Sequence, residues 1–399
     1  MNKLLVVDEH RYYRTPDGKV WIPSQNDYNF WKRYLAVFER VKVVSRIEDI
    51  DSVPEHMLLS SGQNIEFVAI SNYVGPYQYL KNIHSVRKQL RGVFDDCSHA
   101  IFRLPSELSF NIIPSYLKSN KPFGIELLID PWDALSPRAA KSVVSPIVRL
   151  RWYFLVKKYC KIANGVAYVT KYALQKRYPC KSMLDKGMNK EYFTANYSSI
   201  DMDKSFIGTP KQYEDMKSFI ITHVGTMHNL VKGQDVLLKA IKLVKDKGFK
   251  VKVNLVGDGR IKNQFIKLAK ELKIDKDVDF VGHLKGSGEV RDYLIKSDLF
   301  VFPTKAEGLP RVIIEAMACG LPCISTPVNG TPELIRSDLL VEATDIKGFS
   351  EKIQWLISNP NMMESISKKN IEIASEYTAD KLQIKRTEFY RNLYAINQR

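Results

Sequence analysis

Two glutamates, Glu307 and Glu315, flank the start of a predicted helix that follows directly on a predicted strand. The apolar residues 300–302 predict the strand, Pro310 suits the first helical turn, and Gly320 suits the C-cap. The unpaired N–H groups and the positive dipole end at such a helix N-terminus favour an anion such as a phosphate. The stretch therefore predicts a phosphate site with one carboxylate ahead of the helix and another inside it.

Glu315 is the more informative of the two, because apolar residues surround it as in a buried helix. A buried carboxylate requires hydrogen-bond donors or a counter-ion, and paired sugar hydroxyls would be suitable donors. The alternative is an i, i+4 ion pair with Arg311 at a solvated edge, worth only about 0.3 kcal/mol. The pattern alone leaves both interpretations open. The apolar neighbours are Val312, Ile313, Ile314, Ala316, Met317 and Ala318.

The composition indicates a globular protein, with 45% hydrophobic and 26% charged residues in a chain of 399. This length suffices for two domains, each with its own core. No apolar run approaches the roughly 20 residues of a membrane-spanning helix, and the first eight residues are too short and too charged for a signal peptide. Five cysteines without a C-x-x-C spacing agree with reduced thiols and provide no metal site. We expect a cytoplasmic protein.

The net charge of +16 is concentrated in residues 138–190, which carry 13 Lys and Arg but only one acid, Asp185. Such a field attracts nucleic acid, an acidic membrane surface or a phosphorylated substrate. The segment has no recognition-helix or aromatic-sheet motif, which argues against nucleic acid. Residues 143–159 interleave cations with aromatic and aliphatic residues, as an interfacial helix does. The alternative is that the apolar face belongs to the core and the charges to a solvated face.

The first half of the chain alternates short apolar strands with helices, which predicts βαβ units and a doubly wound parallel sheet. Residues 180–216 lose this alternation and are predicted to be an inter-domain linker. The strands are predicted near residues 4–8, 41–44, 66–70, 100–104, 124–129 and 166–170, and the helices near 77–91, 106–118 and 138–160.

Ligands of such sheets bind outside the carboxyl ends of the strands. Asp130 and Asp133 follow a predicted strand there and could bind sugar hydroxyls or act on a proton, or one of them could cap the next helix. The candidate residues on this side are His10, Arg11, Arg14, Arg103, Asp130 and Trp132.

A second alternating set of strands and helices begins near residue 219. Lys232 is predicted at a helix N-terminus beside the phosphate site, where it would serve as a point charge for a diphosphate, unless it is simply a solvated lysine. Gly257-x-Gly259-x-x-Lys262 lacks the third glycine of a dinucleotide fingerprint, so a nicotinamide-dependent enzyme is not indicated. The chain ends in an amphipathic helix long enough to return to the first domain.

Several motifs of the second half together resemble the donor domain of the GT-B retaining glycosyltransferases of family 4, over residues 217–380. The first half is similar to the branch that builds bacterial capsule, O-antigen or exopolysaccharide, notably at residues 29–35, 129–133 and 167–171. The donor-domain motifs are Gly225…Lys232-Gly233, Val256-Gly-Asp-Gly259, Val281-Gly-His283, Glu307-Gly-Leu-Pro and Glu315-Ala-Met-Ala-Cys-Gly-Leu-Pro.

The resemblance implies two Rossmann-like α/β domains that face each other across a cleft. Residues 1–200 would bind the acceptor, residues 217–380 the nucleotide-sugar donor, and the terminal helix 380–399 would pack back on the first domain. It further implies metal-independent hexosyl transfer without a cofactor, from a UDP-sugar more than a GDP-sugar, to a growing and lipid-linked surface glycan. A peripheral position on the inner face of the membrane would follow. A nucleotide-sugar epimerase of the same fold and a non-catalytic partner subunit are the alternatives.

The resemblance also implies roles for individual residues. Glu307 would contact the transferred sugar, Glu315 the ribose hydroxyls and Lys232 the diphosphate, while Asp130 is the N-domain candidate for catalysis. The backbone near His283 would hold the base. The implied donor-binding residues are Gly225, Thr226, Lys232, Gly257, His283, Leu284, Glu307, Gly308, Leu309, Pro310 and Glu315.

Two positions depart from the family pattern. Thr226 stands where an arginine is common, six residues before the lysine, and Ile129-Asp130 stands where a histidine is common. The charge of the leaving group could instead be met by Arg11, Arg14 or Arg103.

Overall fold

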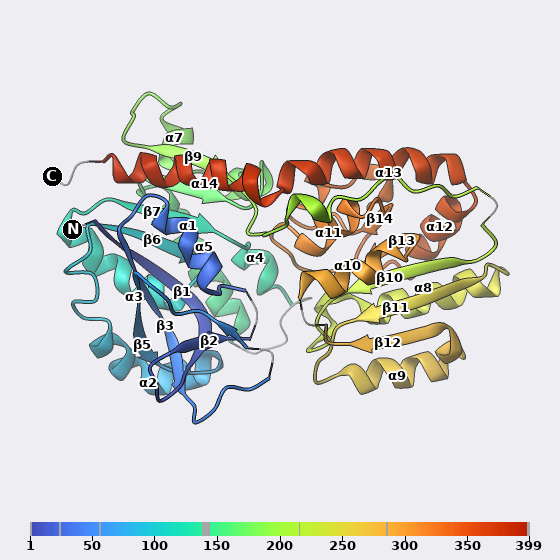
Figure 1. Cartoon of the computed structure of the whole chain (residues 1–399), viewed down its shortest axis with the longest axis horizontal. Coiled ribbons are helices and arrows are strands. Elements are labelled where there is room, and N and C mark those ends of the chain that lie inside the picture. Colours follow the sequence, from blue (N-terminus) through green and yellow to red (C-terminus); the bar gives the residue numbers. More distant parts are fainter. Residues whose placement is uncertain are drawn as a thin grey trace.

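Two separate sheets organise the chain in the computed structural model, which describes residues 2–23, 25–55, 57–137, 144–214, 216–284 and 286–396. The first sheet lies on the left of Figure 1 and the second on the right. Both are built on parallel strands connected by helices, so the predicted α/β class with two parallel sheets is confirmed.

The N-terminal sheet has the parallel order β5-β3-β1-β6-β7-β8-β9, and β2 and β4 add antiparallel pairing at the far end of β1. Its central strands β6, β7 and β8 are buried throughout, as expected when helices cover both faces. The strands are β1 (Lys3–Arg14), β2 (Val20–Ile22), β3 (Arg40–Asp49), β4 (Leu58–Leu59), β5 (Ile65–Ser71), β6 (His99–Leu104), β7 (Phe123–Leu127), β8 (Gly165–Tyr168) and β9 (Phe193–Asn196).

Helices of the N-terminal part begin where side chains cap them, with Asp27 accepting from the Phe30 N–H and Ser106 from the Ser109 N–H. Residues 138–143 of the predicted helix 138–160 lie outside the described residues. The helices are α1 (Tyr28–Leu35), α2 (Gly75–Gln89), α3 (Glu107–Tyr116), α4 (Pro131–Ala134), α5 (Ser145–Cys160), α6 (Ala173–Arg177) and α7 (Lys181–Leu184).

The structure differs from the sequence prediction at the edges of this sheet. Strand β1 continues well beyond residue 8, because an irregularity between Val7 and Arg11 restores its pairing with β3. Strands β2 and β4 were not predicted, since each has only two or three residues. Strand β9 lies inside the segment 180–216 that was predicted as linker, and it pairs with β8.

The C-terminal sheet is fully parallel, in the order β12-β11-β10-β13-β14. Helix α8 buries Val236, Leu237 and Ile241 on one face, as an amphipathic helix does. The elements are β10 (Phe219–Val224), α8 (Gln234–Asp246), β11 (Val251–Val256), α9 (Lys262–Glu271), β12 (Val278–Gly282), α10 (Ser287–Ile295), β13 (Leu299–Phe302), α11 (Arg311–Ala318), β14 (Cys323–Ser325), α12 (Ile346–Ile357) and α13 (Pro360–Ala374).

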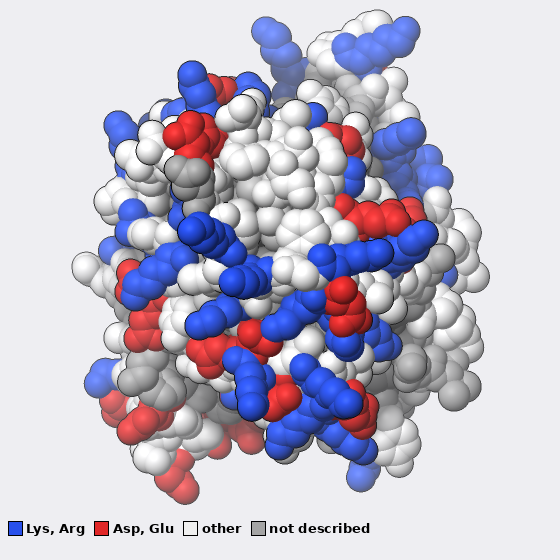
Figure 2. Space-filling view, turned by 90° about the vertical axis from the view of Figure 1, so that its right-hand side faces the viewer, with Lys and Arg blue, Asp and Glu red and all other residues white. Residues whose placement is uncertain are grey.

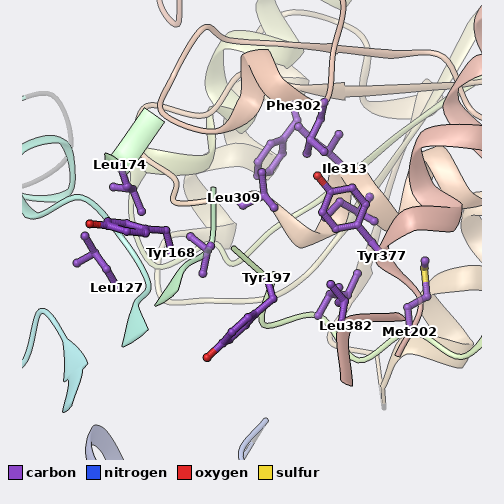
Figure 3. Packing of buried hydrophobic residues seen from close by; sticks show 14 of the residues in the cluster. Leu127, Tyr168, Leu174, Tyr197, Met202, Phe302, Leu309, Ile313, Tyr377 and Leu382 are labelled. Carbon is purple, nitrogen blue, oxygen red and sulfur yellow. The ribbon is translucent and has the colours of Figure 1, made fainter. Parts of the chain in front are cut away.

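The buried apolar residues form one cluster that passes from one sheet region to the other. Figure 3 shows Leu127 and Tyr168 of the N-terminal sheet in one view with Leu309 and Ile313 of the C-terminal part. Because apolar side chains fill this junction, the two halves are held as neighbours by the same hydrophobic effect that forms each core.

Helix α14 (Ala379–Tyr394) returns to the N-terminal sheet and lies along the top of Figure 1 beside α13. Phe389, Tyr390 and Leu393 are buried in this contact. Phe389 lies against two glycines of neighbouring strands, since a Cβ on Gly124 would come within 3.2 Å of its ring and one on Gly165 within 2.9 Å. Because Gly124 and Gly165 have no side chains, the Phe389 ring of the returning helix can pack directly against the sheet.

Phe389→Ala is expected to lower the free energy of unfolding by about 3–5 kcal/mol, because it removes a buried ring and leaves a cavity beside two glycines that cannot fill it. Urea denaturation followed by circular dichroism measures the change. Ile384→Ala is the control, because Ile384 lies on the same helix and is 70% exposed; its effect should stay within about 0.5 kcal/mol. Equal effects of the two substitutions would contradict the packing argument.

Candidate active site

The residues predicted to bind a donor come together at the carboxyl ends of the C-terminal strands, where α/β sheets bind ligands. Gly225 and Thr226 follow β10, Gly257 follows β11, His283 and Leu284 follow β12, and residues 304–310 follow β13. Gly257 has a φ of +130°, and a Cβ there would lie 2.2 Å from the Gly225 carbonyl oxygen. The first two loops can therefore touch only because residue 257 is glycine.

Lys232 and Glu307 form an ion pair at the centre of this edge. The Lys232 Nζ lies 2.5 Å from the Glu307 Oε1, which also accepts a hydrogen bond of 2.9 Å from the Thr304 hydroxyl. Both charged side chains are mostly buried. Lys232 is therefore a partly desolvated cation beside the start of α11, and the solvated-lysine alternative does not describe it.

The loop that carries Glu307 and Gly308 is held from behind by the segment after β14. The Asn329 side-chain amide donates to the Glu307 carbonyl at 3.0 Å, and the Gly330 N–H donates to the Gly308 carbonyl at 3.0 Å. Pro310 is the N-cap of α11 rather than its first helical residue. These bonds fix the backbone around the helix N-terminus before any ligand is present.

Glu315 lies one and a half turns into α11, close to Arg311. Burial raises the pKa of Glu315 to about 7, although the Arg311 charge opposes the shift. Burial also lowers the pKa of Arg311, against the charges of Glu315 and Glu307. Within the described chain no ion pair shorter than 4 Å joins the two residues, so the solvated-edge pair is not what the structure has.

His223 is a buried residue of this site that the sequence analysis missed. Its Nδ1 lies 3.0 Å from the Val301 carbonyl oxygen, and burial lowers its pKa to about 4, so the ring is neutral with its proton on Nδ1. The Nε2 has no hydrogen-bond partner among the described residues and lies beneath Gly225, where a Cβ would be 3.2 Å away. Only its place at the end of a predicted strand could have suggested it.

Two of the three arginines proposed for the N-terminal wall have partners within the protein. Arg103 is buried, with NH1 2.6 Å from Asp8 Oδ1 and Nε 3.3 Å from Glu126. Arg14 pairs with Asp49 at 2.7 Å on the exposed end of β1. Arg11 is exposed. Trp132 carries the Arg149 guanidinium over its ring at 3.8 Å.

Asp130 caps helix α4, which is one of the two roles that the sequence left open. It accepts from the Trp132 N–H at 2.8 Å and from the Tyr178 hydroxyl at 2.6 Å, and it forms an ion pair with Arg177. Burial raises the pKa of Asp130, and these partners act against the rise. Asp133 shares Arg177 at 3.1 Å. The Asp130 carboxylate is therefore surrounded by protein groups.

The two halves touch directly beside Glu307. A Cβ on Gly308 would come within 2.2 Å of the Leu128 carbonyl oxygen at the end of β7. A cavity of about 160 Å³ adjoins this contact on the N-terminal side. Its lining is Asp8, Glu9, His10, Arg103, Leu104, Pro105, Leu128 and Ile129. The candidate active site is the space between this cavity and the start of α11.

A carboxylate also crosses between the two halves. Glu333 of the C-terminal part accepts hydrogen bonds from the backbone N–H groups of Lys171, Tyr172 and Ala173, at 2.5, 2.9 and 2.8 Å.

Among the described residues no group of three or more His, Cys, Asp and Glu is arranged to hold a metal ion.

Comparisons with known proteins agree with this geometry. Residues 209–372 match the family model of the group 1 glycosyl transferases. Protein CapJ of Staphylococcus aureus is 25% identical over 92% of this chain and 90% of its own length. The capsular polysaccharide biosynthesis glycosyltransferase CapM of the same species is 30% identical over 37% of this chain, and the chain spans only about two fifths (39%) of that relative.

Solved structures show the same fold over the whole chain. HepE of Anabaena with UDP has a TM-score of 0.67 at 17% identity and covers 97% of this chain and 99% of its own. Sucrose-phosphate synthase of Thermosynechococcus elongatus has a TM-score of 0.67 at 16% identity, and the match covers 99% of this chain and 100% of the synthase chain. Together the comparisons support a glycosyltransferase of the GT-B fold, with residues 209–372 as its group 1 segment.

Proposed function

We propose that the chain is a retaining glycosyltransferase of the family 4 type that moves a hexosyl group from a nucleotide sugar to a growing bacterial surface glycan. The observation that carries the proposal is the Lys232–Glu307 pair, which lies at the N-terminus of α11 and against the N-terminal half. Residues 217–380 bind the donor and residues 1–200 bind the acceptor. The name of CapM, a capsular polysaccharide biosynthesis glycosyltransferase, supports a surface glycan as the product.

The donor is a UDP-sugar in preference to a GDP-sugar, a choice supported by the UDP and UDP-glucose complexes of HepE. Lys232 leaves Glu307 for the diphosphate, and the backbone N–H groups at the start of α11 face the same phosphates. Glu307 then contacts the transferred sugar. Cleavage of the bond to the diphosphate develops negative charge on the leaving oxygen, and fixed donors stabilise that charge without a metal ion.

Turnover of nucleotide sugars is the direct test. We expect the purified protein to hydrolyse one UDP-sugar slowly without acceptor, in EDTA as well as in buffer, and to release sugar of unchanged anomeric configuration by NMR. Glu307→Gln should lower turnover about 100-fold, because its carboxylate contacts the transferred sugar, while Glu351→Gln on the exposed face of α12 should not. Complete loss in EDTA that manganese restores would contradict the metal-free mechanism, and interconversion of sugars would indicate an epimerase.

Glu315→Gln should separate binding from stability. The pKa of Glu315, about 7 in the fold against 4.5 when unfolded, favours the protonated form, so its stabilisation is present below pH 4.5 and is lost as pH rises through 7. At pH 8 the glutamine variant should therefore be more stable, by about 3 kcal/mol in urea denaturation. It should bind UDP more weakly by about 1–3 kcal/mol in calorimetry, because one of the two carboxylate oxygens that accept from the ribose hydroxyls is replaced by a donor NH2 group. Unchanged UDP affinity would remove Glu315 from the donor site.

We further propose that the basic segment 138–190 docks on the inner face of the cell membrane and brings the protein to a lipid-linked acceptor. Helix α5 carries Ile147, Leu150 and Phe154 on its outer face, the first 71% and the last 58% exposed, next to the exposed cation Lys158. Arg151 on the same helix pairs with Glu107 at 2.6 Å. The core contacts of the helix come from other positions. The apolar stripe is thus not simply core, and it matches an interfacial helix.

The basic residues on the end of the C-terminal part do not form such an interfacial surface. Figure 2 shows Lys and Arg interspersed with Asp and Glu on the end of the C-terminal part, where pairs such as Lys242–Asp246 neutralise each other. Helix α2 could extend the docking surface with Lys81, Arg87, Lys88 and Arg91. None of the described helices is long and apolar enough to cross a bilayer.

Sedimentation with vesicles tests the docking. We expect binding to anionic vesicles that weakens at high salt, since each cation near such a leaflet contributes up to about 1 kcal/mol. The double variant Ile147→Ser/Phe154→Ser should bind less, and Ile384→Ser on helix α14 should bind as the wild type does. Equal, negligible sedimentation with anionic and neutral vesicles would overturn the proposal.

A further inference from the structure

A small cavity lies between the N-terminal sheet and the returning helix α14. Its volume is about 10 Å³, which is about the room that one buried water needs. Four charged side chains line it, namely Arg33 of α1, Arg103 of β6, Glu126 of β7 and Arg386 of α14. Its lining also includes Leu127, Tyr168 and Tyr197, which Figure 3 labels. Positive charges therefore outnumber the negative one around a space that is too small for a sugar or a phosphate.

The three arginines are buried side chains with fixed charges. None of them is more than 9% exposed, and the guanidinium group does not lose its proton in proteins. The guanidinium carbons of Arg33 and Arg103 lie 4.0 and 4.6 Å from the centre of one ring, that of Phe30. The guanidinium carbon of Arg386 lies 5.8 Å from the centre of the Tyr197 ring. Aromatic faces attract cations but do not neutralise them, so the wall of the cavity carries three positive charges.

The acids near the cavity are too few to balance these arginines. Glu126 accepts hydrogen bonds from three tyrosine hydroxyls, and its Oε2 lies 3.3 Å from Arg103 Nε. The NH1 of Arg103 lies 2.6 Å from Asp8 Oδ1. Even with Asp8 counted, two acids meet three arginines. At least one positive charge at the cavity therefore has no counter-ion among the described residues.

Arg33 and Arg386 are the arginines without an acid. Neither guanidinium forms an ion pair within the part of the chain that the structure describes, and the buried Nε of each has no hydrogen-bond partner there. Arg386 donates from NH2 to the carbonyl oxygens of Ser198 at 2.7 Å and Ile200 at 3.0 Å. Burial and the charge of Arg33 lower the pKa of Arg386. The surplus charge and two buried donors thus belong to the same small space.

We propose that the cavity is a halide site that holds one chloride ion between Arg33 and Arg386. A single monatomic anion supplies the negative charge that the surrounding groups lack, and it accepts from several N–H groups at once. A water molecule could also accept these hydrogen bonds. Water would leave the surplus charge unpaired in the interior, which is strongly unfavourable. The inference does not depend on the proposed glycosyl transfer.

Bound chloride would connect segments that meet only in the fold. Arg33 belongs to α1 near the start of the chain and Arg386 to α14 near its end. Arg386 also holds the segment after β9 through its hydrogen bonds to two backbone carbonyls. An ion that binds the folded chain and not the unfolded chain stabilises the fold by mass action. The stability of the protein should therefore depend on chloride itself and not only on ionic strength.

Thermal unfolding of the full chain tests this dependence, with sodium chloride exchanged for sodium gluconate at constant ionic strength. Gluconate is too large for the cavity, so the wild-type melting temperature should rise with chloride by at least about 2 °C. Arg33→Met should melt independently of the anion, and in gluconate at or above the wild-type temperature, because it removes a charge that has no counter-ion. Lys32→Met is the control, since it removes an exposed cation from the same helix and should keep the chloride dependence.

Crystals grown with sodium bromide locate the ion directly. We expect an anomalous difference peak in the cavity of the wild type and of Lys32→Met, and none in Arg33→Met. A wild type without this peak overturns the inference, and so does an Arg33→Met variant that keeps both the peak and the chloride dependence. A bromide peak without any effect of chloride on the melting temperature indicates an adventitious ion only, and it also overturns the inference.

The two wild-type measurements decide the question even where Arg33→Met does not fold. Because no measurement uses a nucleotide sugar, failure of the halide site is distinguishable from failure of the proposed function.

Discussion

The close approach of two backbone loops at Gly233 is the constraint on which the candidate active site depends. Gly233 has a φ of +78°, and a Cβ there would lie 2.1 Å from the Pro303 carbonyl oxygen. Because residue 233 has no side chain, the two loops approach closely enough for the Lys305 N–H to donate to the Val231 carbonyl at 2.8 Å. The same approach places Lys232 in its ion pair with Glu307. The placement of the charges is thus a consequence of backbone contact, and a larger residue at 233 would move the cation away from α11.

A buried charge organises the opposite wall. Glu126, on β7, lies near Arg103 and accepts hydrogen bonds from the hydroxyls of Tyr34, Tyr197 and Tyr390. A carboxylate in the interior is tolerated only when such donors surround it. These three tyrosines come from α1, from the segment after β9 and from α14, so segments far apart in the sequence meet at one acid.

The sequence was sufficient for the alternation of strands and helices and for grouping Gly225, Lys232 and Glu307 at one sheet edge, because glycine, proline and apolar periodicity are local signals. It could not decide between two roles for Asp130, since the Tyr178 and Arg177 that surround the carboxylate are 47 or more residues away in the chain. The sequence also suggested that Arg103 is free to meet the charge of the leaving group. The partners of Arg103, Asp8 and Glu126, lie on the strands on either side of it, and only the strand order reveals that the three side chains converge. The short β9 carried too little apolar pattern to be seen.

The Glu333 contact and the apolar junction hold the two halves together by different interactions. The three hydrogen bonds of Glu333 join a carboxylate to backbone N–H groups at an exposed edge, and water can replace both sets of partners, so each bond contributes only about 1 kcal/mol net. Water cannot replace the contacts of the apolar junction that contains Met202, Tyr377 and Leu382. Separation there would expose buried apolar side chains to water, which is unfavourable. We therefore expect the two halves to separate more easily at the Glu333 contact than at the apolar junction.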